Sequence, residues 1–125
     1  MDGEVGLDPL RMSEREYFRS IRKRLGMYVG VPTLGGAEAF LVGYDQAARR
    51  GGSPGLEGWR EWMLARMDGP CCHVWSGIAV HLATGAPCRC TNGSPGSAAD
   101  EDAAIDMLFR LLDEYLAERE ATVAE

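Results

Sequence analysis

Four cysteines and two histidines are the residues of this sequence best suited to chemistry, and they all fall within 20 residues: Cys71, Cys72, His73, His81, Cys88 and Cys90. Thiolates and imidazoles are the ligands that zinc prefers, and four of them make a tetrahedral site. The set lacks the usual C-x-x-C pairs, so free, partly buried thiols compete with zinc as an interpretation. A disulfide between 71 or 72 and 88 or 90 suits a reducing cytosol poorly. Catalysis by a cysteine, with His73 or His81 as base, needs an oxyanion hole and an orienting acid that nothing here supplies.

Acidic side chains are the second group with functional potential. Asp102, Asp106 and Asp113 are spaced by four and seven residues, which puts them on one face of a predicted helix, opposite its apolar residues. This position predicts that the three acids are solvated. As a surface for a protein partner, the candidates are Glu38, Asp45, Glu57, Glu61, Asp68, Asp102, Asp106 and Asp113.

The charge of the chain is unevenly distributed. The net charge is −6, yet residues 11–24 carry six basic residues against two acids, and residues 100–125 carry nine acids against two arginines. Overall acidity argues against nucleic-acid binding, which needs many phosphate-neutralising cations. It favours a basic protein partner or simple solubility. With no signal peptide and no membrane-spanning run, we expect a cytoplasmic protein that is a monomer or homodimer.

These residues must be positioned by helices, because apolar residues recur at helical spacing along most of the chain. Ser13 and Glu16 form a capping-box pattern that predicts a helix over 13–25, ended by Gly26 as a left-handed cap. A second helix follows Thr33 and ends at Arg49-Arg50. Further helices are predicted over 56–67, over 74–84 and from Asp100 onward. Residues 27–29 are predicted to be extended.

The predicted fold is all-α, a single compact domain of about five helices; an α+β fold with short strands near 27–29 and 74–82 is the alternative. The domain is expected over residues 12–120, with a flexible N-terminus at 1–11, a flexible loop at 85–99 and a frayed end at 121–125. Its predicted core is Phe18, Ile21, Leu34, Leu41, Tyr44, Trp59, Met63, Ile78, Leu108, Phe109 and Leu112.

The stretch IRKRLGMYVG at 21–30 locally resembles the N-terminal segment of GHKL ATPases. In that family the next helix carries a catalytic glutamate and a metal-binding asparagine. Here the next helix offers Glu38, Asp45 and Gln46 but no asparagine, and no Asp-x-Gly-x-Gly loop follows. ATP binding is therefore not expected, and the basic run is explained by its place in the last turn of a helix, where cations offset the dipole.

The order of motifs over residues 13–117 resembles small bacterial immunity-type proteins that are encoded beside secreted, polymorphic or contact-dependent toxins. The motifs are the RKRxGMYxG-like turn, F-L-x-G-Y at 40–44, W-x-x-W at 59–62, a segment beginning near Trp75, and an acidic start to the last helix at 100–104. The family pattern has a proline where this chain has Leu25, and it lacks the cysteine-rich insert.

The resemblance implies binding without catalysis, with no cofactor. We expect a non-enzymatic protein that neutralises a cognate toxin by direct contact with a basic surface, because charge complementarity accelerates association. Two alternatives stay open: a zinc-binding or cysteine-dependent protein using Cys71, Cys72, Cys88 and Cys90, and a helical interaction domain with another partner.

Overall fold

A computed structural model describes residues 8–67, 74–85 and 97–124 of the chain, which form six helices and no strand. The helices are α1 (Glu14–Lys23), α2 (Leu25–Val29), α3 (Leu34–Arg50), α4 (Trp59–Leu64), α5 (Trp75–Thr84) and α6 (Ala98–Ala124). The all-α prediction is confirmed. The alternative with strands near 27–29 and 74–82 is wrong, since these residues belong to α2 and α5.

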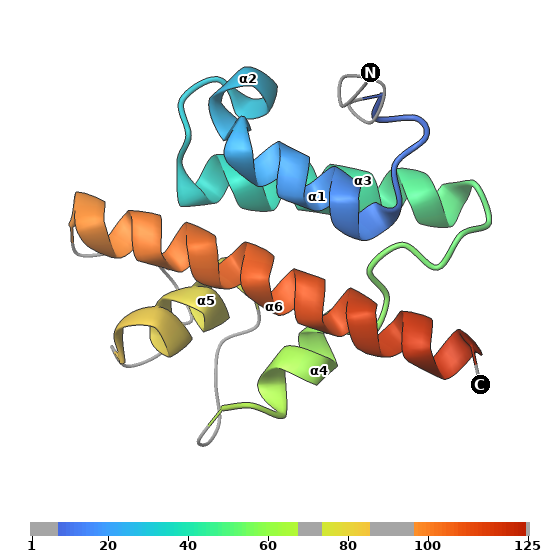
Figure 1. Cartoon of the computed structure of the whole chain (residues 1–125). Helices are drawn as coiled ribbons and strands as arrows, with labels where there is room; N and C mark the ends of the chain where they lie inside the picture. The colour runs from blue at the N-terminus through green and yellow to red at the C-terminus, as the bar shows by residue number, and fades with distance from the viewer. Residues whose placement is uncertain (1–7, 68–73, 86–96, 125) are drawn as a thin grey trace.

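Helix α6 is the central element of the fold. It crosses the whole molecule, with α1, α2 and α3 on one side of it and α4 and α5 on the other (Figure 1). A helix packed on two sides needs a buried surface wider than one stripe. That is what the sequence supplies, because the buried positions of α6 are Ala104, Ile105, Leu108, Phe109, Leu111, Leu112 and Leu116.

The core agrees with the predicted one at ten of its eleven positions, all of which are at most 7% exposed. Tyr44 is the exception and is only half-buried. Its ring packs against Phe18 while its hydroxyl donates to Glu14, so the polar end of the side chain keeps it at the edge of the core.

The N-terminal helix begins as predicted and ends earlier than predicted. Both hydrogen bonds of the capping box between Ser13 and Glu16 are present. The helix ends at Lys23, and Gly26 is not its cap but lies inside α2. The bend at Arg24 lets Leu25 and Val29 pack on the core, and Gly30, at a φ of 86°, ends α2 instead. Burial of these two side chains favours a turn of helix over the extended piece predicted at 27–29.

The other helices differ from prediction mainly at their ends. Helix α4 starts at Trp59 rather than near residue 56, because Gly58 has a φ of 90° that a helix cannot continue through. Helix α6 starts two residues before Asp100, with the Ser97 hydroxyl accepting from the Asp100 amide, and it extends to Ala124. Within the described ranges, no helix combines the length and the apolar character needed to cross a membrane.

Candidate functional site

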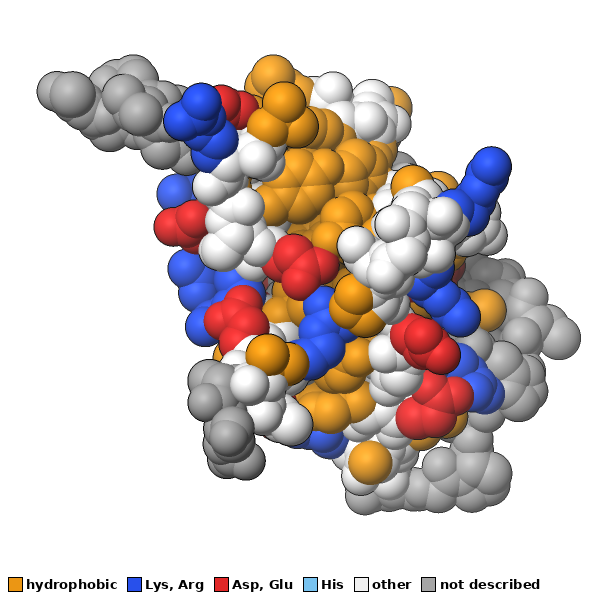
Figure 2. Space-filling view, turned by 90° about the vertical axis from the view of Figure 1, so that its right-hand side faces the viewer, with side chains coloured by type: hydrophobic (Ala, Val, Ile, Leu, Met, Phe, Trp, Pro, Cys, Tyr) orange, Lys and Arg blue, Asp and Glu red, His pale blue; other side chains and the backbone are white. Residues whose placement is uncertain are grey.

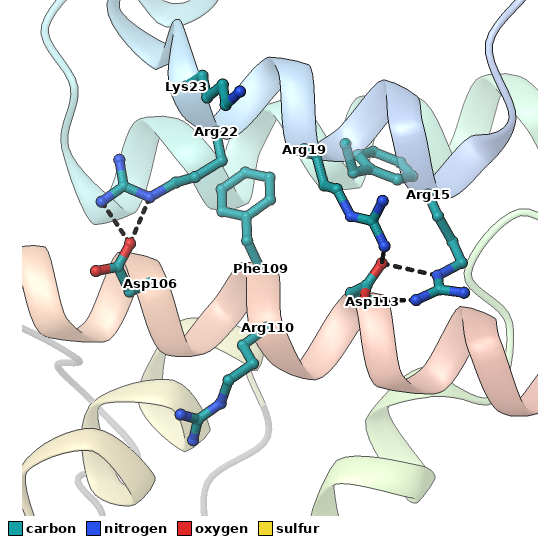
Figure 3. Close-up of a pocket in the computed structure, with 9 residues that line it drawn as sticks. Arg15, Arg19, Arg22, Lys23, Asp106, Phe109, Arg110 and Asp113 are labelled. Carbon is teal, nitrogen blue, oxygen red and sulfur yellow. Dashed lines mark hydrogen bonds and ion pairs between the residues drawn. The ribbon is translucent and has the colours of Figure 1, made fainter.

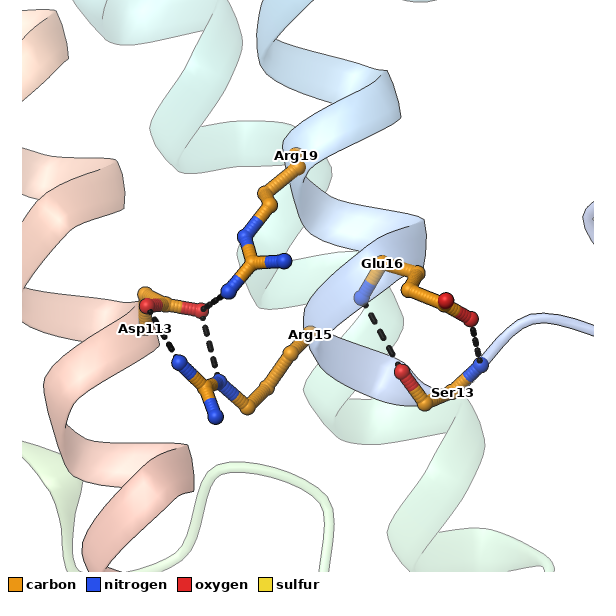
Figure 4. Close-up of polar contacts among 5 residues, drawn as sticks. All are labelled: Ser13, Arg15, Glu16, Arg19 and Asp113. Carbon is orange, nitrogen blue, oxygen red and sulfur yellow. Dashed lines mark hydrogen bonds and ion pairs between the residues drawn. The ribbon is translucent and has the colours of Figure 1, made fainter.

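A row of ion pairs, which we call the α1–α6 seam, joins three arginines of α1 to three aspartates of α6. The Arg15 guanidinium donates from Nε and Nη2 to the two carboxylate oxygens of Asp113, each at 2.9 Å, and Arg19 reaches the same carboxylate at 3.4 Å (Figure 4). Arg22 donates to Asp106 at 2.8 Å and to Asp102 at 3.1 Å. The acids predicted to form a solvated face therefore meet α1, although Asp102 and Asp106 stay 70% and 63% exposed.

The space between the two ends of the seam is a shallow groove of about 350 Å³ with an aromatic floor. Phe109 lies between the Asp106 and Asp113 ion pairs, and Lys23 stands above it on α1 (Figure 3). The described residues that line the groove include no serine, threonine, cysteine or histidine, so they offer no hydroxyl or thiol nucleophile and no imidazole base. Since its carboxylates are already held by arginines, the seam is a structural contact between α1 and α6.

The seam makes the stability of the protein sensitive to acid. The hydrogen bond from Arg15 holds the pKa of Asp113 below its usual value of about 3.9. A carboxyl group with a depressed pKa stabilises the fold above its unfolded-state pKa, and this contribution is lost as the pH falls through the folded-state pKa. We expect Asp113→Asn to lower the free energy of unfolding by about 1 kcal/mol at neutral pH. The difference from wild type should shrink on acidification below about pH 4, as measured by urea unfolding; a difference independent of pH would contradict it.

A second hollow, of about 370 Å³, is lined by tyrosines from three helices, and we call it the tyrosine hollow. Tyr17 comes from α1, Tyr28 from α2 and Tyr44 from α3. The rings of Tyr17 and Tyr44 have centroids 6.1 Å apart. Glu14 also lines the hollow: one of its carboxylate oxygens accepts from the Tyr44 hydroxyl, and the other accepts from Arg119 at 2.8 Å.

The remaining wall of the tyrosine hollow is apolar, and two exposed apolar residues lie close to Tyr28 in the chain. Pro9, Leu10 and Met12 complete the lining, and Leu10 is 92% exposed. Met27 and Val31, which flank Tyr28 in the chain, are 78% and 74% exposed. On the face of the molecule drawn in Figure 2, hydrophobic side chains gather in a band between charged groups of both signs. Exposed apolar surface with a polar rim is typical of protein-binding sites.

Two tyrosines of the hollow, Tyr17 and Tyr44, are uncharged at neutral pH. Burial, and then the hydrogen bond to Glu14, raise the pKa of the Tyr44 hydroxyl. Burial also raises the pKa of Tyr17. Neutral rings with electron-rich faces, next to a carboxylate, form a surface that suits apolar groups and cations.

Two of the acids predicted to contact a partner hold the fold together. Glu38 accepts from the backbone amide and from the hydroxyl of Ser76, both at 2.9 Å, at the start of α5. Asp45 accepts from the Leu56 amide at 2.7 Å and its side chain is only 14% exposed. Both carboxylates satisfy amides of segments distant in sequence.

The other predicted contact acids are placed differently. Glu57 and Glu61 are 69% and 71% exposed, each with an arginine within 3.9 Å, so they remain available to a partner. Asp68 lies outside the described residues, as do five of the six candidate zinc ligands: Cys71, Cys72, His73, Cys88 and Cys90. His81 lies half-buried on α5. In the part of the chain that the structure describes, no group of three potential ligands could hold a metal ion.

Sequence reasoning missed the tyrosine hollow. It assigned Tyr44 to the core and gave no role to Tyr17 or Glu14. Three of the four tyrosines of the chain line this hollow, and the enrichment of tyrosine at protein interfaces was a usable signal. Comparison of the chain with protein-family models, with curated proteins and with solved structures gives no match.

Proposed function

We propose that this chain is a non-catalytic binding protein of the immunity type, which neutralises a cognate toxin in the cytoplasm by direct contact. The observation that carries the proposal is the tyrosine hollow with its exposed apolar surroundings, which we propose as the contact surface. The motif order at residues 13–117, which resembles toxin-immunity proteins, supplies the class of partner.

The composition of this surface supports a protein partner. Tyrosines contribute large contact area at low cost in conformational entropy, and they are enriched among the residues that dominate binding energy. Leu10, which lines the hollow, and Met27 and Val31, which are close to Tyr28 in the chain, are each more than 70% exposed. Burying them against a partner removes about 25 cal/mol of unfavourable hydration per Å² of apolar surface.

The charge of the chain supports a basic partner. Glu14 lines the hollow, Asp8 precedes its Pro9 wall, and the net charge of the molecule is −6. Long-range attraction between an acidic and a basic protein raises the association rate, and salt weakens it. The exposed acids Glu57, Glu61, Asp102 and Asp106 add to this field without touching the partner.

The test is co-expression of the chain with the product of the neighbouring reading frame. We expect a stoichiometric complex, and we expect the neighbouring product to be toxic without this chain. Met27→Lys should weaken the complex at least about tenfold, because it places a positive charge in a buried contact opposite a basic surface. Calorimetric titration of the purified proteins would measure this.

Val123→Lys is the matched control, since Val123 is 81% exposed near the C-terminal end of α6 and does not line the tyrosine hollow. It should leave the affinity unchanged. Equal effects of the two substitutions would place the contact elsewhere. If no complex forms and no neighbouring product is toxic, the immunity hypothesis fails, and a helical interaction domain with another partner replaces it.

A further inference from the structure

We propose that the tyrosine hollow is an aromatic cage that binds one arginine side chain of the basic partner. This inference rests on the proposed function and adds to it the chemistry of the central contact. It follows from the arrangement of the rings, from the carboxylate beside them and from the size of the space.

The three rings are held in place before any partner arrives. Phe18 braces two of them edge-on, with ring centroids 5.2 Å from Tyr17 and 4.8 Å from Tyr44. Phe40 braces Tyr28 in the same way at 5.8 Å. The tyrosines come from three different helices, and the ring planes of Tyr17 and Tyr44 are tilted by 33°, so these two rings do not stack face to face. A preformed site loses less conformational entropy on binding than a mobile one.

The electrostatics of the hollow favour a cation. The faces of tyrosine rings attract cations, and arginine is the side chain most often found against them. Glu14 lines the hollow with a carboxylate that accepts one hydrogen bond from Tyr44 and one from Arg119. A carboxylate has about four acceptor positions, so it can also accept from a guanidinium. Arg119 does not line the hollow; it lines a separate one, with Trp62 and Tyr115.

The size and walls of the hollow fit a guanidinium on its stem. A volume of about 370 Å³ lies at the lower end of the range for small-ligand sites, about 300–1,000 Å³. Pro9, Leu10 and Met12 offer apolar contact to the methylene groups of an arginine, which bury readily while the charged end finds polar partners. The groove along the α1–α6 seam offers no comparable site, because arginines already occupy it.

The first test uses the protein alone and two small probes, N-acetyl-arginine amide and its neutral isostere N-acetyl-citrulline amide. In a nuclear magnetic resonance titration, the arginine probe should shift the ring signals of Tyr17, Tyr28 and Tyr44. It should bind about tenfold more tightly than the citrulline probe. Equal affinities, or shifts elsewhere on the protein, would overturn the cage.

The second test separates the ring face from mere apolar volume. Tyr28 is 40% exposed and outside the core, so we expect its substitution to leave the fold intact, which circular dichroism would check. Tyr28→Phe keeps an aromatic face and should hold the arginine probe within about twofold of wild type. Tyr28→Leu keeps an apolar side chain but has no ring. It should bind the arginine probe about tenfold more weakly than wild type and the citrulline probe with unchanged affinity. If Tyr28→Leu does not fold, the comparison of the two probes decides alone.

The same variants distinguish failure of the cage from failure of the proposed function. In the complex with the co-expressed partner, Tyr28→Leu should weaken binding about tenfold and Tyr28→Phe should not. If neither variant changes the affinity of the complex and the two probes bind equally, the cage is wrong while the immunity function still holds. If the protein prefers the arginine probe but forms no complex with the partner, the immunity function is wrong while the cage still holds.

Discussion

Leu112→Ala is expected to lower the free energy of unfolding by about 3 kcal/mol, a large part of the 5–15 kcal/mol typical of a single domain. Leu112 is fully buried in the middle of α6, the helix that α1, α3, α4 and α5 all contact. Truncation removes apolar contacts on α6 and leaves a cavity that helices on its two sides cannot both close. Urea denaturation followed by circular dichroism would measure the loss, with the slope of the transition checked for two-state behaviour.

Val123→Ala is the matched substitution, because it lies on the same helix with its side chain 81% exposed. It should change the free energy of unfolding by less than about 0.5 kcal/mol. A cost below about 1 kcal/mol for Leu112→Ala would mean that α6 is not the packed centre of the fold.

Local signals made much of this fold predictable. The apolar spacing of α6, the Ser13–Glu16 capping box and the Thr33 cap of α3 are each decided within a few residues. A helix start depends on one hydrogen bond to an amide three residues away, and a buried face depends on spacing alone. These features could therefore be predicted from the sequence without knowing which helices pack against each other.

Features decided by distant residues were not predictable. The helical turn of α2 depends on burial of Leu25 and Val29 against other elements. The late start of α4 depends on the segment before it, where Asp45 of α3 holds the Leu56 amide. A sequence states which face of a helix is apolar, but it does not state which helix meets that face or in what register.

The charge asymmetry of the chain shows the same limit. A basic early segment and an acidic late one were read as surfaces for a partner, or as solvated faces. In the structure Arg15 and Arg22 pair with Asp113 and Asp106. Part of the positive charge of the early segment is therefore neutralised by the negative charge of the late one. What remains for a partner is the net acidity of the molecule and the tyrosine hollow. For this reason we place the specific contact at the hollow and leave the acids a long-range role.

Glu38→Ala is expected to lower the free energy of unfolding by about 2 kcal/mol, although Glu38 was selected from the sequence as a residue for partner contact. The N-cap residue of α5, Val74, makes no side-chain capping bond, and the carboxylate of Glu38 caps the helix from α3, accepting from the amide and the hydroxyl of Ser76. Ser76 is only 8% exposed, so water cannot fully replace the lost acceptor. Alanine would leave two donors unsatisfied at a helix start. Chemical denaturation of the isolated protein measures this effect without any partner.

Glu38→Gln is the control that separates the hydrogen bonds from the charge. The amide oxygen of glutamine can accept from the Ser76 backbone, and its amino group can donate to the Ser76 hydroxyl oxygen. Only the attraction between a negative charge and the helix N-terminus is lost, which contributes about 0.3–1 kcal/mol. We therefore expect Glu38→Gln to cost less than half as much stability as Glu38→Ala. Should both variants keep wild-type stability and instead weaken the partner complex, Glu38 would be a contact residue, as the sequence alone suggested. Because the Glu38 carboxylate already binds Ser76, we expect Glu38→Ala to lower the free energy of unfolding.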